Sequence, residues 1–123
     1  MEIAGLIAHE KISRERLNEV MEDIRKSGII RYPVIIDRKT KTILDGHHRT
    51  EACRLMGLKR VPAFLVNYSD SRIKVTSRRN IPVSKREVIK RGQNSLPFPH
   101  KTTKHILPFR KKRIDIPISR LNQ

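Results

Sequence analysis

The segment Leu44–Met56, with the sequence LDGHHRTEACRLM, decides the fold of this chain. Its apolar start predicts the end of a strand, Asp45 and Gly46 predict a tight turn, and the apolar residues after His48 recur at helical spacing. The sequence therefore predicts a strand–turn–helix whose helix opens with two imidazoles and a guanidinium. Unpaired backbone N–H groups and the positive end of the helix dipole meet at such a turn, so we expect it to bind a polyphosphate.

Asp45 lies just before this turn, where a carboxylate can hold a divalent metal on the phosphate or orient a histidine. Each residue type also has an ordinary structural role, because Asp-Gly is a common turn and a histidine near a helix start is often a cap or a solvated side chain. The conjunction of Asp, Gly, two His and Arg in one turn after a strand is much rarer. The pattern favours a phosphate-handling site.

The flanking sequence predicts two more helices. Residues 13–27 carry apolar side chains at helical spacing, with Ser13 as the N-cap and Gly28 at the C-terminal end. Ser84 opens a capping box, which predicts a short helix that ends at Gly92.

Short apolar runs predict the strands of the fold, and the run that contains Pro62 is expected at a sheet edge. The expected strands, the last two of them weaker, cover residues 33–37, 42–44, 61–66, 73–76 and 114–118. Residues 93–109 contain three prolines and are expected to form a loop with at most one helical turn. Strands and short helices alternate without a strict βαβ pattern, which predicts one compact α+β domain over residues 1–123.

The charge is strongly positive. The chain has 28 Lys and Arg against 12 Asp and Glu, a formal net charge of +16, concentrated in its second half. Such a balance indicates an anionic partner: a nucleic acid, a nucleotide or a phosphorylated metabolite. Aromatic residues make up only 4% of the chain, which argues against nucleic-acid binding through stacked bases, whereas the net charge leaves nucleic acid open as a partner.

Cys53 is the only cysteine, so an intramolecular disulfide is impossible and a reducing compartment fits. Its place on the apolar side of the predicted helix indicates a buried structural thiol.

No run reaches the roughly 18 apolar residues of a membrane span, and the N-terminus lacks a secretory pattern. We therefore expect a cytoplasmic protein with no membrane partner. The composition is weakly compatible with a thermophilic source.

Two further segments carry chemistry. Glu10 follows His9 immediately before the first helix, where a carboxylate also has the simple role of favouring the helix dipole. The segment His100–His105 sets two hydroxyls among basic groups, which suits a tetrahedral anion and equally suits a surface loop. We expect the basic C-terminal loop, residues 93–113, to complete the site.

The segment Gly46–Ala52 resembles the Gly-x-x-Arg-x-x-Ala box of the ParB/sulfiredoxin superfamily, which binds nucleotide phosphates. Within it, three stretches are similar to the archaeal free serine kinases: His9-Glu10, residues 34–49, and residues 101–109. The resemblance implies a ParB/sulfiredoxin-like domain with a mixed sheet and short helices. It also implies phosphorylation of free L-serine to O-phospho-L-serine for cysteine biosynthesis, with ADP or ATP as donor. From the residues themselves we expect Mg²⁺ as a cofactor that helps to neutralise the nucleotide phosphates.

Carried over by position, the resemblance implies that Glu10 is the catalytic general base and Asp45 the acidic, metal-binding residue at the phosphate site. The phosphate-binding turn would be Gly46, His47, His48 and Arg49. The loop that completes the phosphate and serine pocket would be Lys101, Thr102, Thr103, Lys104 and His105.

Two departures from the family matter. Some members carry a long insertion where this chain has only about residues 72–82, so this is a short form. The member compared has Arg where this chain has Lys104, which replaces a bidentate phosphate contact with a point contact. The donor stays open between ATP, which we favour, and ADP.

Two other classes of protein are alternatives. A ParB-like DNA-associated partition or regulatory protein agrees with the net charge, but it needs a helix-turn-helix, and no clear one follows residue 70. A sulfiredoxin-like reductase needs a cysteine in the phosphate turn, where this chain has His47.

Overall fold

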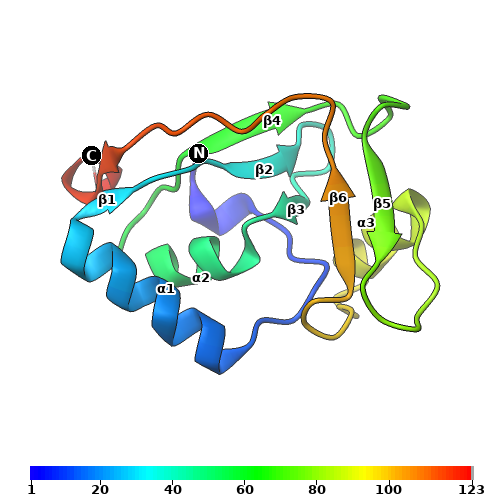
Figure 1. Cartoon of the computed structure of the whole chain (residues 1–123), viewed down its shortest axis with the longest axis horizontal. Coiled ribbons are helices and arrows are strands. Elements are labelled where there is room, and N and C mark those ends of the chain that lie inside the picture. The colour runs from blue at the N-terminus through cyan, green and yellow to red at the C-terminus, as the bar shows by residue number, and fades with distance from the viewer. Residues whose placement is uncertain (123) are drawn as a thin grey trace.

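The computed structural model describes residues 1–122. Its helices are α1 (Arg14–Ser27), α2 (His47–Leu55) and α3 (Lys85–Gln93), as Figure 1 shows. Ser13 caps α1 by accepting a hydrogen bond from the Arg16 N–H, and Ser84 caps α3 in the same way. The predicted helices are confirmed together with the N-caps Ser13 and Ser84 and the left-handed Gly28, whereas α3 ends at Gln93, one residue beyond the predicted Gly92.

A three-stranded sheet, in the order β3-β2-β4, lies at the centre of the fold. Strand β2 pairs antiparallel with β3 and parallel with β4, so the expected mixed sheet is confirmed, with β4 at an edge. The strands are β1 (Ile29–Ile30), β2 (Val34–Asp37), β3 (Ile43–Asp45), β4 (Ala63–Val66), β5 (Lys74–Ser77), β6 (Thr103–Ile106) and β7 (Ile116–Pro117). Short 3-10 helices cover Ile3–Gly5 and Ile118–Asn122. The α+β class is confirmed.

Strand β2 supplies side chains to both halves of the core, because successive strand residues point to opposite faces. Val34 and Ile36 join the cluster that contains residues of α1 and α2, whereas Ile35 joins the cluster that contains Phe98 and Val88 of α3. In Figure 1, α1 and α2 lie together on one side of β2 and β3. The start of α2 is thereby held between the sheet and α1.

Residues 93–109 are not all loop, and this prediction was wrong. Strand β6 lies inside the segment and pairs antiparallel with β5, Thr103 opposite Ser77 and Ile106 opposite Lys74. The prolines at 97, 99 and 108 flank the strand and do not interrupt it. Strand β1, which pairs with β7, was missed because two residues give no alternation to detect.

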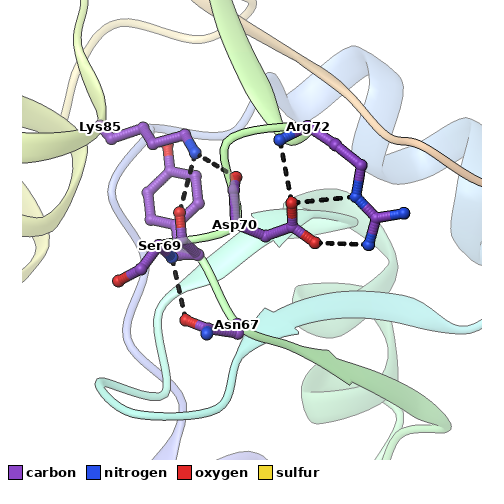
Figure 2. A network of polar contacts seen from close by, with 6 residues as sticks. Asn67, Ser69, Asp70, Arg72 and Lys85 are labelled. Carbon is purple, nitrogen blue, oxygen red and sulfur yellow. Dashed lines mark hydrogen bonds and ion pairs between the residues drawn. The ribbon is translucent and has the colours of Figure 1, made fainter.

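A polar network fixes the turn between β4 and β5 (Figure 2). The Lys85 ammonium donates to the backbone oxygens of Tyr68 and Asp70, at 2.9 and 2.7 Å. The Asp70 carboxylate accepts from the backbone N–H and guanidinium of Arg72, which lowers the pKa of Asp70 to about 2. These bonds attach the start of α3 to the sheet.

Within residues 1–122, each helix is too short or too polar to cross a lipid bilayer.

Candidate active site

The predicted strand–turn–helix is present. Strand β3 ends at Asp45, α2 begins at His47, and Gly46 joins them with a left-handed backbone at φ 103°. A Cβ on Gly46 would lie 2.5 Å from Cγ1 of Val34, inside the buried sheet. Both the backbone conformation and the space therefore require glycine at this position.

Arg49 lies one turn into α2. Its Nη1 donates to the backbone oxygens of Tyr32 and Pro33, at 3.3 and 3.0 Å. These bonds hold the guanidinium beside the turn, where its positive charge adds to that of the helix N-terminus.

Glu10 contacts the loop that precedes β6. Its Oε1 accepts from the backbone N–H groups of Thr102 and Thr103, at 3.1 and 2.8 Å, and from Oγ1 of Thr103 at 2.9 Å. The segment around Glu10 is also bonded to Phe98, which donates to the His9 oxygen and accepts from the Lys11 N–H. Two stretches more than 90 residues apart in sequence therefore meet at one carboxylate.

These groups face one cavity of about 460 Å³. The predicted site residues that line it are Glu10, Asp45, Gly46, His47, His48, Arg49, Lys101 and Thr103. Three others lie outside the lining. Thr102 is buried and its hydroxyl donates to the Pro99 oxygen, Lys104 is exposed on β6, and His105 accepts or donates at 2.7 Å to the Tyr68 hydroxyl.

The far end of the same cavity has a different character. Apolar side chains of α1 and β1 line it together with Tyr32, and four charged side chains stand among them: Arg16, Glu19, Asp23 and Arg31. Sequence reasoning missed this end, since its residues come from a helix face and a two-residue strand with no motif. The cavity is therefore lined by Glu10 with its neighbouring basic and hydroxyl groups, by the turn at residues 45–49, and by a mixed apolar and charged surface from α1 and β1.

Lys111 lies in the basic segment 93–113 that was expected to complete the site, but it was not singled out as a site residue. Its ammonium lies 2.5 Å from Oδ2 of Asp45, with both side chains partly exposed. The basic run at residues 110–113 was visible in the sequence, but nothing local in it indicated Asp45 as a partner. The pair brings a cation from the C-terminal segment to the turn at residues 45–49.

Histidines form a buried group beside the cavity. The ring of His9 lies 4.6 Å from that of His47 and 5.7 Å from that of His105, measured between centroids. Burial lowers the pKa of His9 and His47 and, with repulsion from His9, lowers that of His105 to about 4. All three imidazoles are therefore neutral at pH 7. The Thr103 hydroxyl lies 3.0 Å from His9 Nε2 as well as against Glu10, so His9 supports the residue that orients the carboxylate.

Asp45 suits a magnesium ion that is shared with a nucleotide. Mg²⁺ is usually held by one or two carboxylates together with substrate phosphates, and Asp45 sits at the turn where we expect the phosphates. Among residues 1–122, no group of three His, Cys, Asp or Glu side chains is arranged to hold a metal by itself. A metal held by Asp45 would therefore need oxygen ligands from a bound phosphate as well.

Cys53 is buried in the core on α2, as expected. Burial raises the pKa of its thiol to about 11, so the reactive thiolate is scarce at pH 8. We expect native protein at pH 8 to react with iodoacetamide at least about a hundredfold more slowly than unfolded protein, in which the pKa returns to about 8.5. Mass spectrometry of the alkylated chain measures this. Rapid alkylation of folded protein would show that the thiol is exposed and available for chemistry.

Known proteins share the fold of this chain. The family model for the ParB N-terminal domain matches residues 6–81. A solved free serine kinase in complex with AMP superposes with a TM-score of 0.88, covering 98% of this chain and 92% of that chain. The sequence identity to it is 17%, so the likeness concerns the fold.

Three curated relatives align with part of the chain. The ATP-dependent L-serine kinase of Staphylothermus marinus is 34% identical over 79 residues, 61% of this chain and 31% of the relative. The ParB-like protein of Sulfolobus acidocaldarius is 36% identical over 67 residues, 54% and 33% of the two chains. The ADP-dependent L-serine kinase of Thermococcus kodakarensis is 28% identical over 79 residues, 61% and 33%. The aligned part thus spans about a third of each relative's length.

Proposed function

The chain belongs to the ParB N-terminal domain family, and from this premise we propose that it phosphorylates free L-serine with an adenine nucleotide. One observation carries the proposal. Glu10, held by the Thr102–Thr103 segment, faces the same cavity as the phosphate turn at residues 45–49. A carboxylate opposite a phosphate site is the arrangement that transfer of a phosphoryl group to an alcohol requires.

The nucleotide occupies the turn and the apolar end. The N-terminus of α2 and the Arg49 guanidinium neutralise its phosphates, since both direct positive charge at the turn. The adenine ring lies against Tyr32 and the apolar residues of α1 and β1, beside the ion pair of Asp23 with Arg31. Phosphoryl transfer depends mainly on such positioning and charge neutralisation.

Glu10 acts as the general base. Three donors converge on its Oε1, so we assign Oε2 to the serine hydroxyl. As the serine oxygen attacks the terminal phosphorus atom, its proton passes to Glu10 and the bond to the leaving nucleotide oxygen breaks. Products are O-phosphoserine and the shortened nucleotide. Arg78 and Lys101 line this end of the cavity and suit the serine carboxylate.

A Mg²⁺ held by Asp45 would supply further positive charge for the phosphates. We expect Asp45→Asn to raise the Mg²⁺ concentration for half-maximal activity by at least roughly tenfold, because a neutral amide is a much weaker ligand. A Mg²⁺ titration of the initial rate measures the shift. Asp115→Asn, an exposed carboxylate paired with Arg113, is the matched control. An unchanged Mg²⁺ dependence in Asp45→Asn would make Asp45 only the partner of Lys111.

ATP is the favoured donor, and ADP stays the alternative. Curated relatives include L-serine kinases of both kinds, and residues at the phosphate turn suit either. Lys111, adjacent to Asp45, adds a positive charge beside the phosphates.

The product O-phosphoserine would enter cysteine biosynthesis, as the resemblance implies. The single reduced thiol of the chain agrees with the cytoplasm as the place of reaction.

A screen of free amino acids tests the proposal. The protein is incubated with Mg²⁺, either ATP or ADP, and one amino acid at a time, and phosphorylated products are identified by mass spectrometry. Phosphoserine with at least one donor is the expected result, with threonine and homoserine as competing alcohols.

A ParB-like DNA-associated protein is the second candidate, favoured by the net charge and by the relative from Sulfolobus acidocaldarius. Against it, α3 is followed by strand β6 within residues 1–122, and no helix-turn-helix pair follows β4 in this part of the chain. Tight binding of duplex DNA at physiological salt, with no phosphoserine formed, would favour this candidate.

A further inference from the structure

Two hydrogen bonds fix the backbone on both sides of Glu10. The His9 N–H donates to Nε2 of His47 at 3.2 Å, and the Ser13 N–H donates to Nε2 of His48 at 2.9 Å. Both acceptors are the first residues of α2, in the phosphate turn. The segment that carries Glu10 is thus attached directly to the element that would hold the nucleotide.

Each bond requires a neutral ring. A ring nitrogen that accepts an N–H carries no proton, so the remaining proton lies on Nδ1. In His48, Nε2 accepts from Ser13, and the proton on Nδ1 could then be donated to a phosphate bound at the turn. His48 therefore links the start of α2 to the segment that carries Glu10.

We propose that His48 is a positioning residue, which sets the place of Glu10 by accepting the Ser13 N–H. The inference rests on the proposed function for the role of Glu10, whereas the bond itself does not. Binding of a phosphate at Nδ1 would stiffen the ring and, through Ser13, the segment that presents the carboxylate. His47 holds the other side of Glu10 in the same way.

Protonation of His48 removes the acceptor. The charged groups around it are Arg16 of α1, Glu10, and His100 and Lys101 of the loop before β6. Burial chiefly, with repulsion from Arg16, lowers the pKa of His48 below 6.5, although Glu10 opposes the shift. The bond is therefore intact at neutral pH and is lost as the pH falls through that lowered pKa.

Two matched variants isolate the positioning role. His48→Gln and His48→Leu both lose the Nδ1–H, but only Gln offers an oxygen to the Ser13 N–H. We expect the two variants to have similar nucleotide KM values. The kcat of His48→Leu should be about fivefold to tenfold lower than that of His48→Gln, because only His48→Leu lacks the hydrogen bond to Ser13. The decline of kcat at acidic pH should begin at a higher pH in the wild type than in His48→Gln. Equal kcat in the two variants would overturn the proposal.

Amide hydrogen exchange at Ser13 tests the bond without any enzymatic activity. Ser13 should exchange slowly in the wild type and in His48→Gln, and about fivefold to tenfold faster in His48→Leu and in His48→Ala. His48 is partly exposed, so these variants should fold, and thermal melting verifies this. Equal Ser13 exchange in all four proteins overturns the positioning role whether or not the chain phosphorylates serine. Absence of phosphoserine in the wild type, with Ser13 exchange as expected, overturns the proposed function and leaves the bond established.

Discussion

Glu10→Gln is expected to lower kcat for phosphoserine formation by roughly 10²–10⁴, the usual loss when a general base is removed. Gln keeps the size of the side chain and one oxygen that can accept from Thr102 and Thr103. The loop before β6 should therefore stay in place, and nucleotide affinity should change little. Steady-state kinetics with serine, together with calorimetric titration of the nucleotide, separates the two effects.

Glu15→Gln is the matched control, because Glu15 is an exposed carboxylate in the first turn of α1 and does not line the cavity. Its kcat should equal that of the wild type. A near-normal kcat in Glu10→Gln would mean that Glu10 only anchors the loop, and the serine hydroxyl would need another base.

Gly46→Ala should lower the free energy of unfolding by about 2–4 kcal/mol, combining a strained left-handed backbone with overpacking of the core. The added Cβ would meet Val34 at 2.5 Å in the buried sheet. The turn cannot shift without moving Asp45 or the start of α2, so nucleotide binding should weaken as well. Urea denaturation and nucleotide titration measure the two losses.

Gly57→Ala separates strain from collision. Gly57 also has a left-handed backbone, at φ 78°, but no atom lies within 4 Å of its added Cβ. The free energy of unfolding of Gly57→Ala should fall by only about 1 kcal/mol, and this variant should still bind nucleotide. If both variants lose the same stability, the contact with Val34 is not what restricts residue 46 to glycine.

Local chemistry made the helices predictable. The caps at Ser13 and Ser84, the left-handed Gly28 and the helical spacing of apolar residues each act within a few residues. The turn at residues 45–49 was predictable for the same reason, since strand, glycine and helix start are adjacent in sequence. These features needed no knowledge of distant partners.

Pairing between distant segments was not predictable. Strand β6 exists because β5 supplies its hydrogen-bond partners, some 30 residues earlier in the chain. The contact of Glu10 with Thr103 spans 93 residues, and only the family resemblance indicated it. No sequence pattern indicated the ion pair of Lys111 with Asp45. The same is true of the hydrogen bonds that His47 and His48 accept from the segment around Glu10.

The histidines also show how a residue type can mislead. Two imidazoles at a phosphate turn indicate contact with phosphate, yet both use Nε2 to accept backbone N–H groups from the segment before α1. A phosphate contact through Nδ1 stays a prediction for His48. The ring of His47 is buried, whereas that of His48 is partly exposed, so His47 is less accessible to a phosphate.

Phosphorus NMR of a single reaction mixture tests the central claim most directly. Wild-type protein is incubated with L-serine, Mg²⁺ and one nucleotide, and the consumption of donor is followed together with the phosphorus signal of each product. We expect one O-phosphoserine for each nucleotide consumed with ATP or with ADP, and no phosphoserine above background in Glu10→Gln. If neither ATP nor ADP is consumed, or if they yield only inorganic phosphate, the assignment of the Glu10 cavity as a serine kinase site is contradicted.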